Sequence, residues 1–114
     1  MLLKHARADP NATDKRGRTL LMTICRNQHV CVEAARLQLE AGADPALAQQ
    51  PNVFIPLHFA ALNGHIDLVH MLHSGAPATL NRCDSKGKMP LFFACAEDHE
   101  GVVSQLKSAC VRSR

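Results

Sequence analysis

Apolar residues recur with the same spacing in three stretches of the chain, residues 19–29, 56–69 and 89–103. In each stretch a leucine is followed three and four positions later by a pair of small or apolar residues, and eight positions later by a histidine. The leucines, which lie 36 and 34 residues apart, are Leu21, Leu57 and Leu91. A period in this range is typical of a protein built from stacked repeats, in which each unit buries its apolar face against its neighbours.

Each stretch begins with one predicted helix, and a second helix is predicted to follow it after a turn. Apolar residues such as Val32, Ala35 and Leu39 recur at helical spacing, and Gly42 can end the helix that they form. Pro56 suits the first position of a helix, where its missing N–H is not needed. The predicted helices cover residues 20–27, 30–41, 57–63, 67–73, 91–97 and 101–109. No extended β-sheet is predicted, so the expected fold class is all-α.

The order of residues within these stretches resembles the ankyrin repeat. The segment from Pro56 to His65, PLHFAALNGH, matches the family signature Thr-Pro-Leu-His-x-Ala-Ala-x-x-Gly-His apart from its threonine, and the other two stretches match about half of it. The resemblance implies a single domain, an ankyrin-type α-solenoid of stacked helix-turn-helix repeats with β-turn fingers. The implied units are a partial repeat at 1–12, a repeat at 13–45, a repeat with an irregular finger at 46–79 and a capping repeat at 80–114.

Two of the three implied fingers are regular, and the middle one is not. Residues 14–18 and 84–88 each place an aspartate three positions before a glycine. In the middle segment Gln50 falls in the aspartate position, Val53 in the glycine position and Ile55 in that of the helix-capping threonine. The middle finger is therefore expected to depart from the geometry of the others, because the glycine position favours a backbone angle that other residues resist.

Cysteine usage bears on compartment and chemistry. The chain has five cysteines, an odd number, and none of them forms a Cys-x-x-Cys pair. We therefore expect no disulfide framework. We expect a reducing, intracellular location in the cytoplasm or nucleus. Cys25 and Cys95 share the repeat position that Ala61 fills, where a small side chain lets neighbouring helices approach, so both are expected to be structural.

The resemblance also gives roles to several of the seven histidines. It implies local hydrogen bonds between helix and turn for three of them, His29, His65 and His99. It implies a bond to backbone near the fingers for His58, a bond expected to be lost where Met22 and Phe92 take that position. No set of three or four converging ligands is apparent, even with His70 and His73 close together, so neither a metal nor a cofactor is predicted.

Composition and motifs narrow the function further. No apolar run is long enough to span a membrane, and no secretory signal is expected. A net charge of +3, with four Phe and no Tyr or Trp, makes nucleic-acid binding a weak candidate. The chain has no Gly-rich phosphate loop and no Gly-x-Ser-x-Gly. Spacing alone leaves a Cys31–His29 pair open, but an enzyme is not expected.

Functional side chains are expected at positions that the repeat leaves free. In the family, the fingertips and the exposed side of the first helix of each pair line a concave face where partners bind. The predicted partner-binding residues, a basic rim around an apolar pair, are Lys15, Arg16, Arg18, Arg26, Phe54, Leu62, Lys86 and Lys88. Lysines and arginines at such positions can equally serve only to keep a surface solvated.

These positions favour a non-catalytic module that binds an acidic or phosphorylated peptide or protein, with an apolar anchor near Phe54. The alternative is an intramolecular regulatory segment of a larger enzyme or channel, and a weaker alternative is nucleic-acid binding through the same basic face. Polar residues such as Ser104 and Lys107 suit a C-terminal cap. At the N-terminal edge, either a further repeat or a contact, including self-association, is expected to cover the first full repeat.

Overall fold

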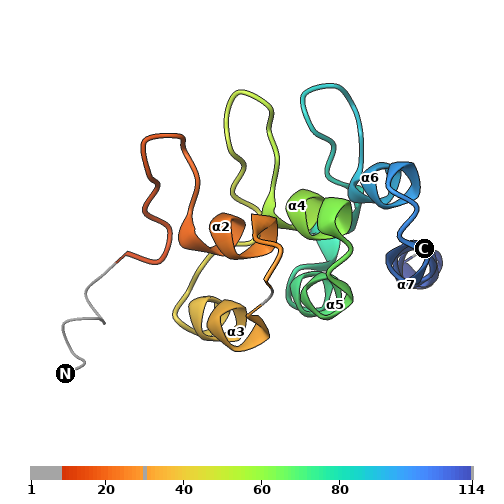
Figure 1. Cartoon of the computed structure of the whole chain (residues 1–114), viewed down its shortest axis with the longest axis horizontal. Helices are drawn as coiled ribbons and strands as arrows, with labels where there is room; N and C mark the ends of the chain where they lie inside the picture. Colours follow the sequence, from red (N-terminus) through yellow and green to blue (C-terminus); the bar gives the residue numbers. More distant parts are fainter. Residues whose placement is uncertain (1–8, 30, 114) are drawn as a thin grey trace.

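The chain folds into helix pairs that stack along one direction (Figure 1). The structure is a computed structural model, and it describes residues 9–29 and 31–113. Its helices are α2 (Leu20–Arg26), α3 (Val32–Glu40), α4 (Pro56–Asn63), α5 (Ile66–Gly75), the 3₁₀ helix η1 (Pro77–Asn81), α6 (Pro90–Ala96) and α7 (Glu100–Ser113). Over these residues the only β-structure is an isolated antiparallel bridge between Gln49 and Phe54. The all-α stack expected from the sequence is confirmed.

The helices form two layers. Helices α2, α4 and α6 make an inner row, α3, α5 and α7 make an outer row, and the three loops that precede the inner helices project from the same side as fingers (Figure 1). Residues 1–8 of the predicted partial repeat lie outside the described residues. The Asn11 side chain joins the start of the described chain to the turn after α3, since it accepts a 2.7 Å bond from the Asp44 amide and donates to the Gly42 carbonyl.

Helix boundaries follow the prediction to within two residues except at the end of α7, which was predicted at residue 109 and lies at Ser113. The sequence placed the end of α5 at residue 73, but α5 continues to Gly75, and the Ala76 amide still donates to the Leu72 carbonyl. The unpredicted 3₁₀ helix then begins at Pro77, whose fixed φ suits a first helical position. No helix among the described residues combines the length and apolarity that a membrane span needs.

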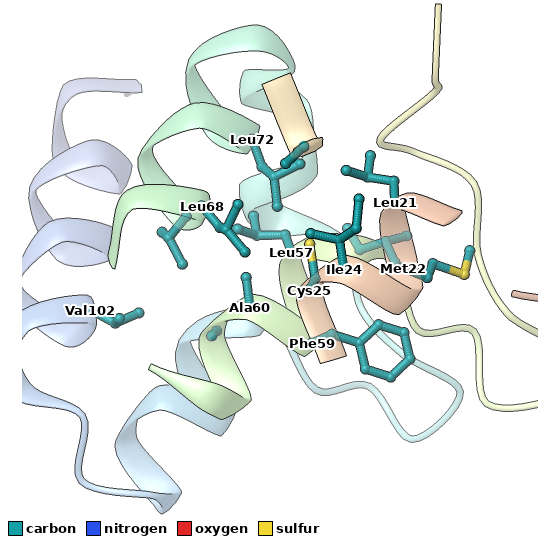
Figure 2. Close-up of a cluster of buried hydrophobic side chains, with 14 of the residues drawn as sticks. Leu21, Met22, Ile24, Cys25, Leu57, Phe59, Ala60, Leu68, Leu72 and Val102 are labelled. Carbon is teal, nitrogen blue, oxygen red and sulfur yellow. The ribbon is translucent and has the colours of Figure 1, made fainter. Parts of the chain in front are cut away.

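The core lies between the two layers and between successive inner helices. Large residues such as Leu57, Leu68 and Leu72 fill the space between layers, and small ones at Cys25 and Ala60 let neighbouring helices approach (Figure 2). All five are almost completely buried. Burial raises the pKa of the Cys25 thiol to about 12, so this cysteine is an inert packing group, as expected.

The expectation that Cys95 is equally structural was wrong, because its side chain is exposed. Cys95 lies on α6, the last inner helix among the described residues. The equivalent residue Cys25 on α2 is covered by the next inner helix, α4, whereas no described helix covers α6 on that side. For the same reason Met89 is 36% exposed and Phe92 is 47% exposed, whereas their equivalents Thr19 and Met22 are buried. The C-terminal edge of the inner row is thus partly apolar, even though Ser104 and Lys107 of α7 are exposed.

The first and third fingers are closed by the same aspartate network. The amides of Arg16 and Arg18 each donate to Asp14 Oδ1 at 2.9 Å, and the equivalent amides of the third finger donate to Asp84 Oδ1. The bond from the Arg18 amide is the main cause of a lowered pKa at Asp14. Burial raises the pKa of Asp84, but its two amide bonds outweigh burial, and that pKa is lowered overall. Each of these two fingers is therefore held by an ionised carboxylate.

Candidate protein-binding site

All four phenylalanines of the chain lie in one connected run on the inner row and its fingers. The Phe54 ring stands edge-to-face against Phe59 on α4 and against Phe93 on α6, with centroids 5.5 and 5.6 Å apart. Phe93 in turn meets Phe92 edge-to-face at 5.4 Å. Edge-to-face pairs of this kind are favourable beyond the area that they bury, so the run is a stable aromatic surface. We call these four residues the aromatic row.

A cation lies at each end of the aromatic row. The Arg26 guanidinium carbon is 5.9 Å from the centroid of Phe59, and Lys88 Nζ is 4.7 Å from the centroid of Phe92. Both contacts are within the range of cation–π attraction. Arg26 is exposed and Lys88 is half-exposed, so both charges remain accessible to a ligand.

A shallow hollow opens over the middle of the aromatic row. Its lining consists of Phe54, His58, Phe59, Leu62 and Phe93, its volume is about 10 Å³, and it is partly open to solvent. The atoms that it exposes are apolar. Figure 2 shows the Phe59 ring at the margin of the buried cluster, on the far side of α4 from Leu68. The two residues that the sequence predicted as an apolar centre, Phe54 and Leu62, are thus brought together here.

The irregular middle finger positions Phe54. The Gln49 amide donates to the Phe54 carbonyl at 2.8 Å, and the amides of Val53 and Phe54 donate back to the Gln49 carbonyl. Placing Gln50 in the aspartate position was therefore wrong, because the pairing residue is Gln49 and the finger is one residue longer than its neighbours. The glycine position was correct, since Val53 has a positive φ of 60°, as Gly17 has a positive φ of 77° in the first finger. A β-branched residue at such an angle is strained.

The middle finger is also tied to both neighbours. The Gln49 side-chain amide donates to the Arg16 carbonyl of the first finger at 2.8 Å. The Ser85 amide of the third finger donates to the Asn52 carbonyl at 2.9 Å. The row of fingers is therefore linked by hydrogen bonds, and Phe54 is held in a continuous structure and not on an isolated loop.

His58 connects the floor of the hollow to the third finger. Its Nδ1 accepts a 3.1 Å bond from the Ile55 amide, and its Nε2 lies 3.1 Å from the Lys88 carbonyl. Only the neutral ring protonated on Nε2 can make both bonds, and burial lowers the pKa of His58 accordingly. In the first repeat part of this pattern survives, because the Thr19 amide donates to Met22 Sδ at 3.4 Å. The expectation that the bond is lost at Met22 was therefore too simple.

A family model of ankyrin repeats, covering three copies, matches residues 1–76 and 31–113 of the chain. The chain belongs to the ankyrin repeat family. It is 33% identical to cyclin-dependent kinase 4 inhibitor B of Rattus norvegicus over 107 residues, which are 94% of this chain and 79% of that protein. It is 31% identical to cyclin-dependent kinase inhibitor 2A of Homo sapiens over 112 residues, 98% of this chain and 69% of that protein.

A third relative is named as a channel and not as a kinase inhibitor. The transient receptor potential channel pyrexia of Drosophila melanogaster is 37% identical over 71 residues, which are 62% of this chain but 7% of the channel. Ankyrin repeats and the kinase inhibitors among these relatives are interaction modules without catalytic chemistry. This ankyrin repeat chain is accordingly a protein–protein interaction module.

Two histidines of the ankyrin signature connect successive repeats. His65 Nε2 lies 2.7 Å from the Asn27 carbonyl, and His99 Nε2 lies 2.9 Å from the Leu62 carbonyl. These bonds reach the end of the preceding inner helix, so the expectation of local bonds between helix and turn was wrong. The Asn63 side chain adds bonds to the Cys25 and Arg26 carbonyls. The ends of the inner helices are thereby locked in register.

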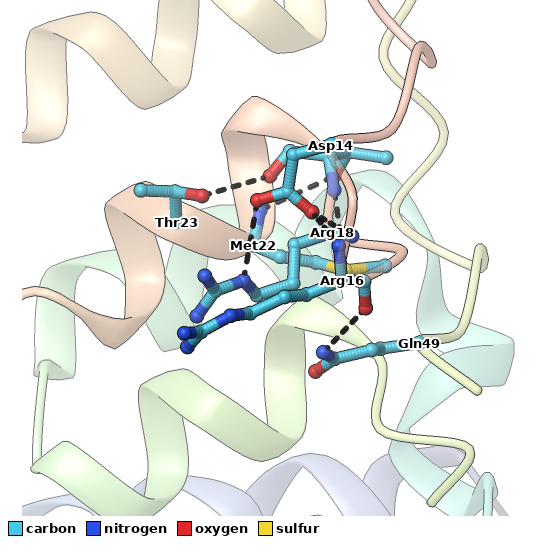
Figure 3. A network of polar contacts seen from close by, with 7 residues as sticks. Asp14, Arg16, Arg18, Met22, Thr23 and Gln49 are labelled. Carbon is cyan, nitrogen blue, oxygen red and sulfur yellow. Dashed lines mark hydrogen bonds and ion pairs between the residues drawn. The ribbon is translucent and has the colours of Figure 1, made fainter. Parts of the chain in front are cut away.

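The basic residues predicted on the ankyrin fingers are not equally available. Lys15, Arg16 and Lys86 are exposed at the fingertips. The Arg18 side chain is only 14% exposed, and its Nε lies 3.4 Å from Asp14 Oδ2 within its own finger (Figure 3). Arg18 therefore has a structural partner already and is a weaker binding candidate than Arg16.

Sequence reasoning missed Phe59, Phe92 and Phe93. Phe59 and Phe93 occupy the variable position between the histidine and the first alanine of the ankyrin signature, where the first repeat has Thr23. Two phenylalanines at a variable position are a signal that could have identified them. Phe59 is mostly buried, so it also contributes to the core.

Metal binding gains no support from the described residues. His70 and His73 lie side by side on α5, with ring centroids 5.4 Å apart. Across residues 9–29 and 31–108, however, no three His, Cys, Asp or Glu side chains gather as metal ligands would. A pair of histidines falls short of the three or four ligands that a zinc site needs.

Proposed function

We propose that the chain binds an acidic or phosphorylated segment of a partner protein on its concave face, with an apolar residue of that segment anchored near Phe54. The observation that carries this proposal is the aromatic row with an accessible cation at each end. Aromatic residues and arginine are the side chains that most often dominate binding energy at protein interfaces. The hollow over the row gives an apolar partner residue a place to lie.

The arrangement of charge supports an acidic partner. Among the described residues, the ion pairs of the outer layer join Arg36 to Glu33 and Glu40, so this cation already has acidic partners. In the part of the chain that the structure describes, Arg16 and Lys86 on the fingers take part in no ion pair. Unpaired cations on one face attract an acidic partner and raise its rate of association. Phosphate suits the Arg16 finger in addition, because a guanidinium can hold it in a bidentate manner.

The names of the relatives suggest which partner to test first. Two of them are named as inhibitors of cyclin-dependent kinases and match nearly the whole chain. We therefore take a cyclin-dependent kinase as the first candidate. The exposed thiols of Cys31, Cys83 and Cys95 fit the reducing, intracellular location in which such a kinase is found.

Binding of the purified chain to purified cyclin-dependent kinase 4 tests the proposal, with Arg16→Glu/Lys86→Glu as the variant that reverses the basic fingers. We expect the variant to bind more weakly and with less dependence on salt. Lys107→Glu makes a charge reversal at an exposed position of α7 and should leave binding unchanged. Should the kinase not bind, affinity capture with the same variants identifies the partner, and a partner that binds all variants equally contradicts the concave site.

A second candidate function follows from the channel relative. In that protein the similar segment is a small part of a much larger chain, which is the setting for an intramolecular regulatory contact. The same concave face would then bind a segment of its own parent chain. This candidate predicts that the added purified chain binds the remainder of its parent protein, and that Phe54→Ala weakens this contact.

A further inference from the structure

Two cations fix where the ends of a bound acidic segment would lie. Arg26 is the last residue of α2, and Lys88 lies two residues before α6. Helices α2, α4 and α6 are successive neighbours in the inner row. Packed helices lie about 8–10 Å apart, so two steps along the row separate the charges by roughly 20 Å. The aromatic row fills the space between them.

We propose that the ligand is an extended segment of one protein chain, with two acidic residues about six positions apart and one large apolar residue midway between them. This inference rests on the proposed function and specifies its ligand. An extended chain covers about 3.3–3.6 Å per residue, so a span of roughly 20 Å corresponds to about six residues. The hollow formed by Phe54, Leu62 and Phe93 lies between the two cations and receives the apolar residue.

The path of the segment follows from the charges on α6. Lys88 precedes the N-terminus of this helix, and the exposed Glu97 follows its C-terminus. An acidic residue is attracted to the first end and repelled by the second. The segment therefore crosses the inner row diagonally, from the C-terminal end of α2 to the finger that precedes α6.

The centre of the path depends on Phe54. Its ring contacts Phe59 on one side and Phe93 on the other, so it joins the halves of the aromatic row. Its backbone is fixed by the Gln49 bridge. The hollow is shallow, which favours a side chain that lies across ring edges, such as leucine or methionine, over a group that inserts deeply.

Two peptides of equal composition test the spacing. One is blocked Glu-Ser-Ser-Leu-Ser-Ser-Glu, and the other is blocked Ser-Ser-Glu-Leu-Glu-Ser-Ser. Titrations into the isotopically labelled chain, followed by NMR, give both affinity and location, and the spectrum also reports whether each variant is folded. We expect the first peptide to bind on the order of five- to tenfold more tightly, since each well-placed exposed ion pair adds a modest free energy. The amides of residues 26, 54 and 88 should shift.

Single variants test each end. Arg26→Glu and Lys88→Glu should each bring the ratio of the two peptide affinities closer to one, whereas Lys107→Glu should leave this ratio unchanged. Replacing one terminal glutamate of the spaced peptide by lysine should restore binding to Arg26→Glu for one end of the peptide only, which gives the direction of the segment. Equal binding of the two peptides overturns the inference, as does binding of neither. Equal binding that is still weakened by Phe54→Ala leaves the proposed function standing without the spacing.

Discussion

Gly64, at the turn between α4 and α5, shows how tightly single residues fit between repeats. Its φ is 73°, a left-handed angle that other residues resist, and a Cβ there would lie 2.6 Å from Nδ1 of the His99 ring. That ring holds the bond to the Leu62 carbonyl. The histidine of one repeat and the glycine of the preceding one therefore form a single structural unit.

Gly64→Ala should lower the free energy of unfolding by roughly 2 kcal/mol or more, because it adds backbone strain to a clash with a packed ring. Gly75→Ala is the matched control. It adds the same methyl group to the last residue of α5, where a Cβ meets no neighbouring residue within 4 Å, and it should be neutral or stabilise by up to about 1 kcal/mol. Urea unfolding followed by circular dichroism compares the two, and equal effects would contradict the packing described for His99.

His58 should make stability depend on pH. Burial lowers its pKa in the folded state below the ordinary value of about 6.5. The unfolded chain then binds more protons than the folded chain below that value, so stability is fully present above about pH 6.5 and is lost as the pH falls further. Unfolding at pH 7.5 and 5.5 measures this loss in the parent and in His58→Asn. The variant should lose less on acidification, and an equal loss would show that His58 does not contribute.

At the scale of elements, periodicity and turn residues predicted most of the structure. Helix ends such as those of α4 and α6 came within one residue of prediction, and a proline marks the start of each locally. The middle finger was placed one residue out, since its closure by Gln49 depends on the path of the backbone and not on a residue type. Exposure of Cys95 was missed because it depends on whether another helix covers α6, which the spacing of residues within a repeat does not reveal.

The candidate site was predictable in outline only. Fingertip positions are free of repeat constraints, so the exposed Arg16 and Lys86 could be found from the register alone. That Arg18 folds back on Asp14 depends on side-chain geometry, as does the edge-to-face contact of Phe54 with Phe93. The Phe54–Phe93 contact joins residues far apart in the chain, which carry no local signal for it.

The third finger tests how the aspartate network stabilises an element. Asp84→Ala leaves the amides of Lys86 and Lys88 without their acceptor and should cost about 1–3 kcal/mol. Asp84→Asn keeps an acceptor oxygen of the same shape and should cost less. Chemical unfolding of both variants at neutral pH measures the difference, and identical stabilities would indicate that the network does not hold the finger.

The contact between inner helices makes a second prediction at this scale. Ala60 is completely buried on α4, so Ala60→Leu should overpack it and lower stability by roughly 1–3 kcal/mol. Ala96 lies exposed at the end of α6, and Ala96→Leu adds the same atoms without that effect. Thermal melts of the two variants separate these outcomes. An Ala60→Leu variant that melts with the parent would mean that the repeat register is wrong.

Over the described residues, the core lies between the inner and outer helices, and the loops that precede the inner helices project away from it (Figure 1). The proposed binding residues lie on the inner helices and on these loops, and Phe59 among them also belongs to the core. Leu20 and Leu37 of the first full repeat are each 52% exposed, so the predicted contact at the N-terminal edge has apolar side chains to cover. That contact stays a prediction, which sedimentation of the purified chain can check.

Binding kinetics of the purified chain with a proposed partner, cyclin-dependent kinase 4 in the first instance, test the concave site most directly. Phe54→Ala should speed dissociation by about tenfold, as loss of a central aromatic anchor commonly does. Arg16→Glu/Lys86→Glu should slow association, and salt should weaken binding of the parent, because exposed charges are screened beyond about 10 Å. Lys107→Glu, a charge reversal at an exposed position of α7, is the control and should change neither rate. A partner whose rates ignore salt and both concave variants would contradict the account and direct attention to the outer helices.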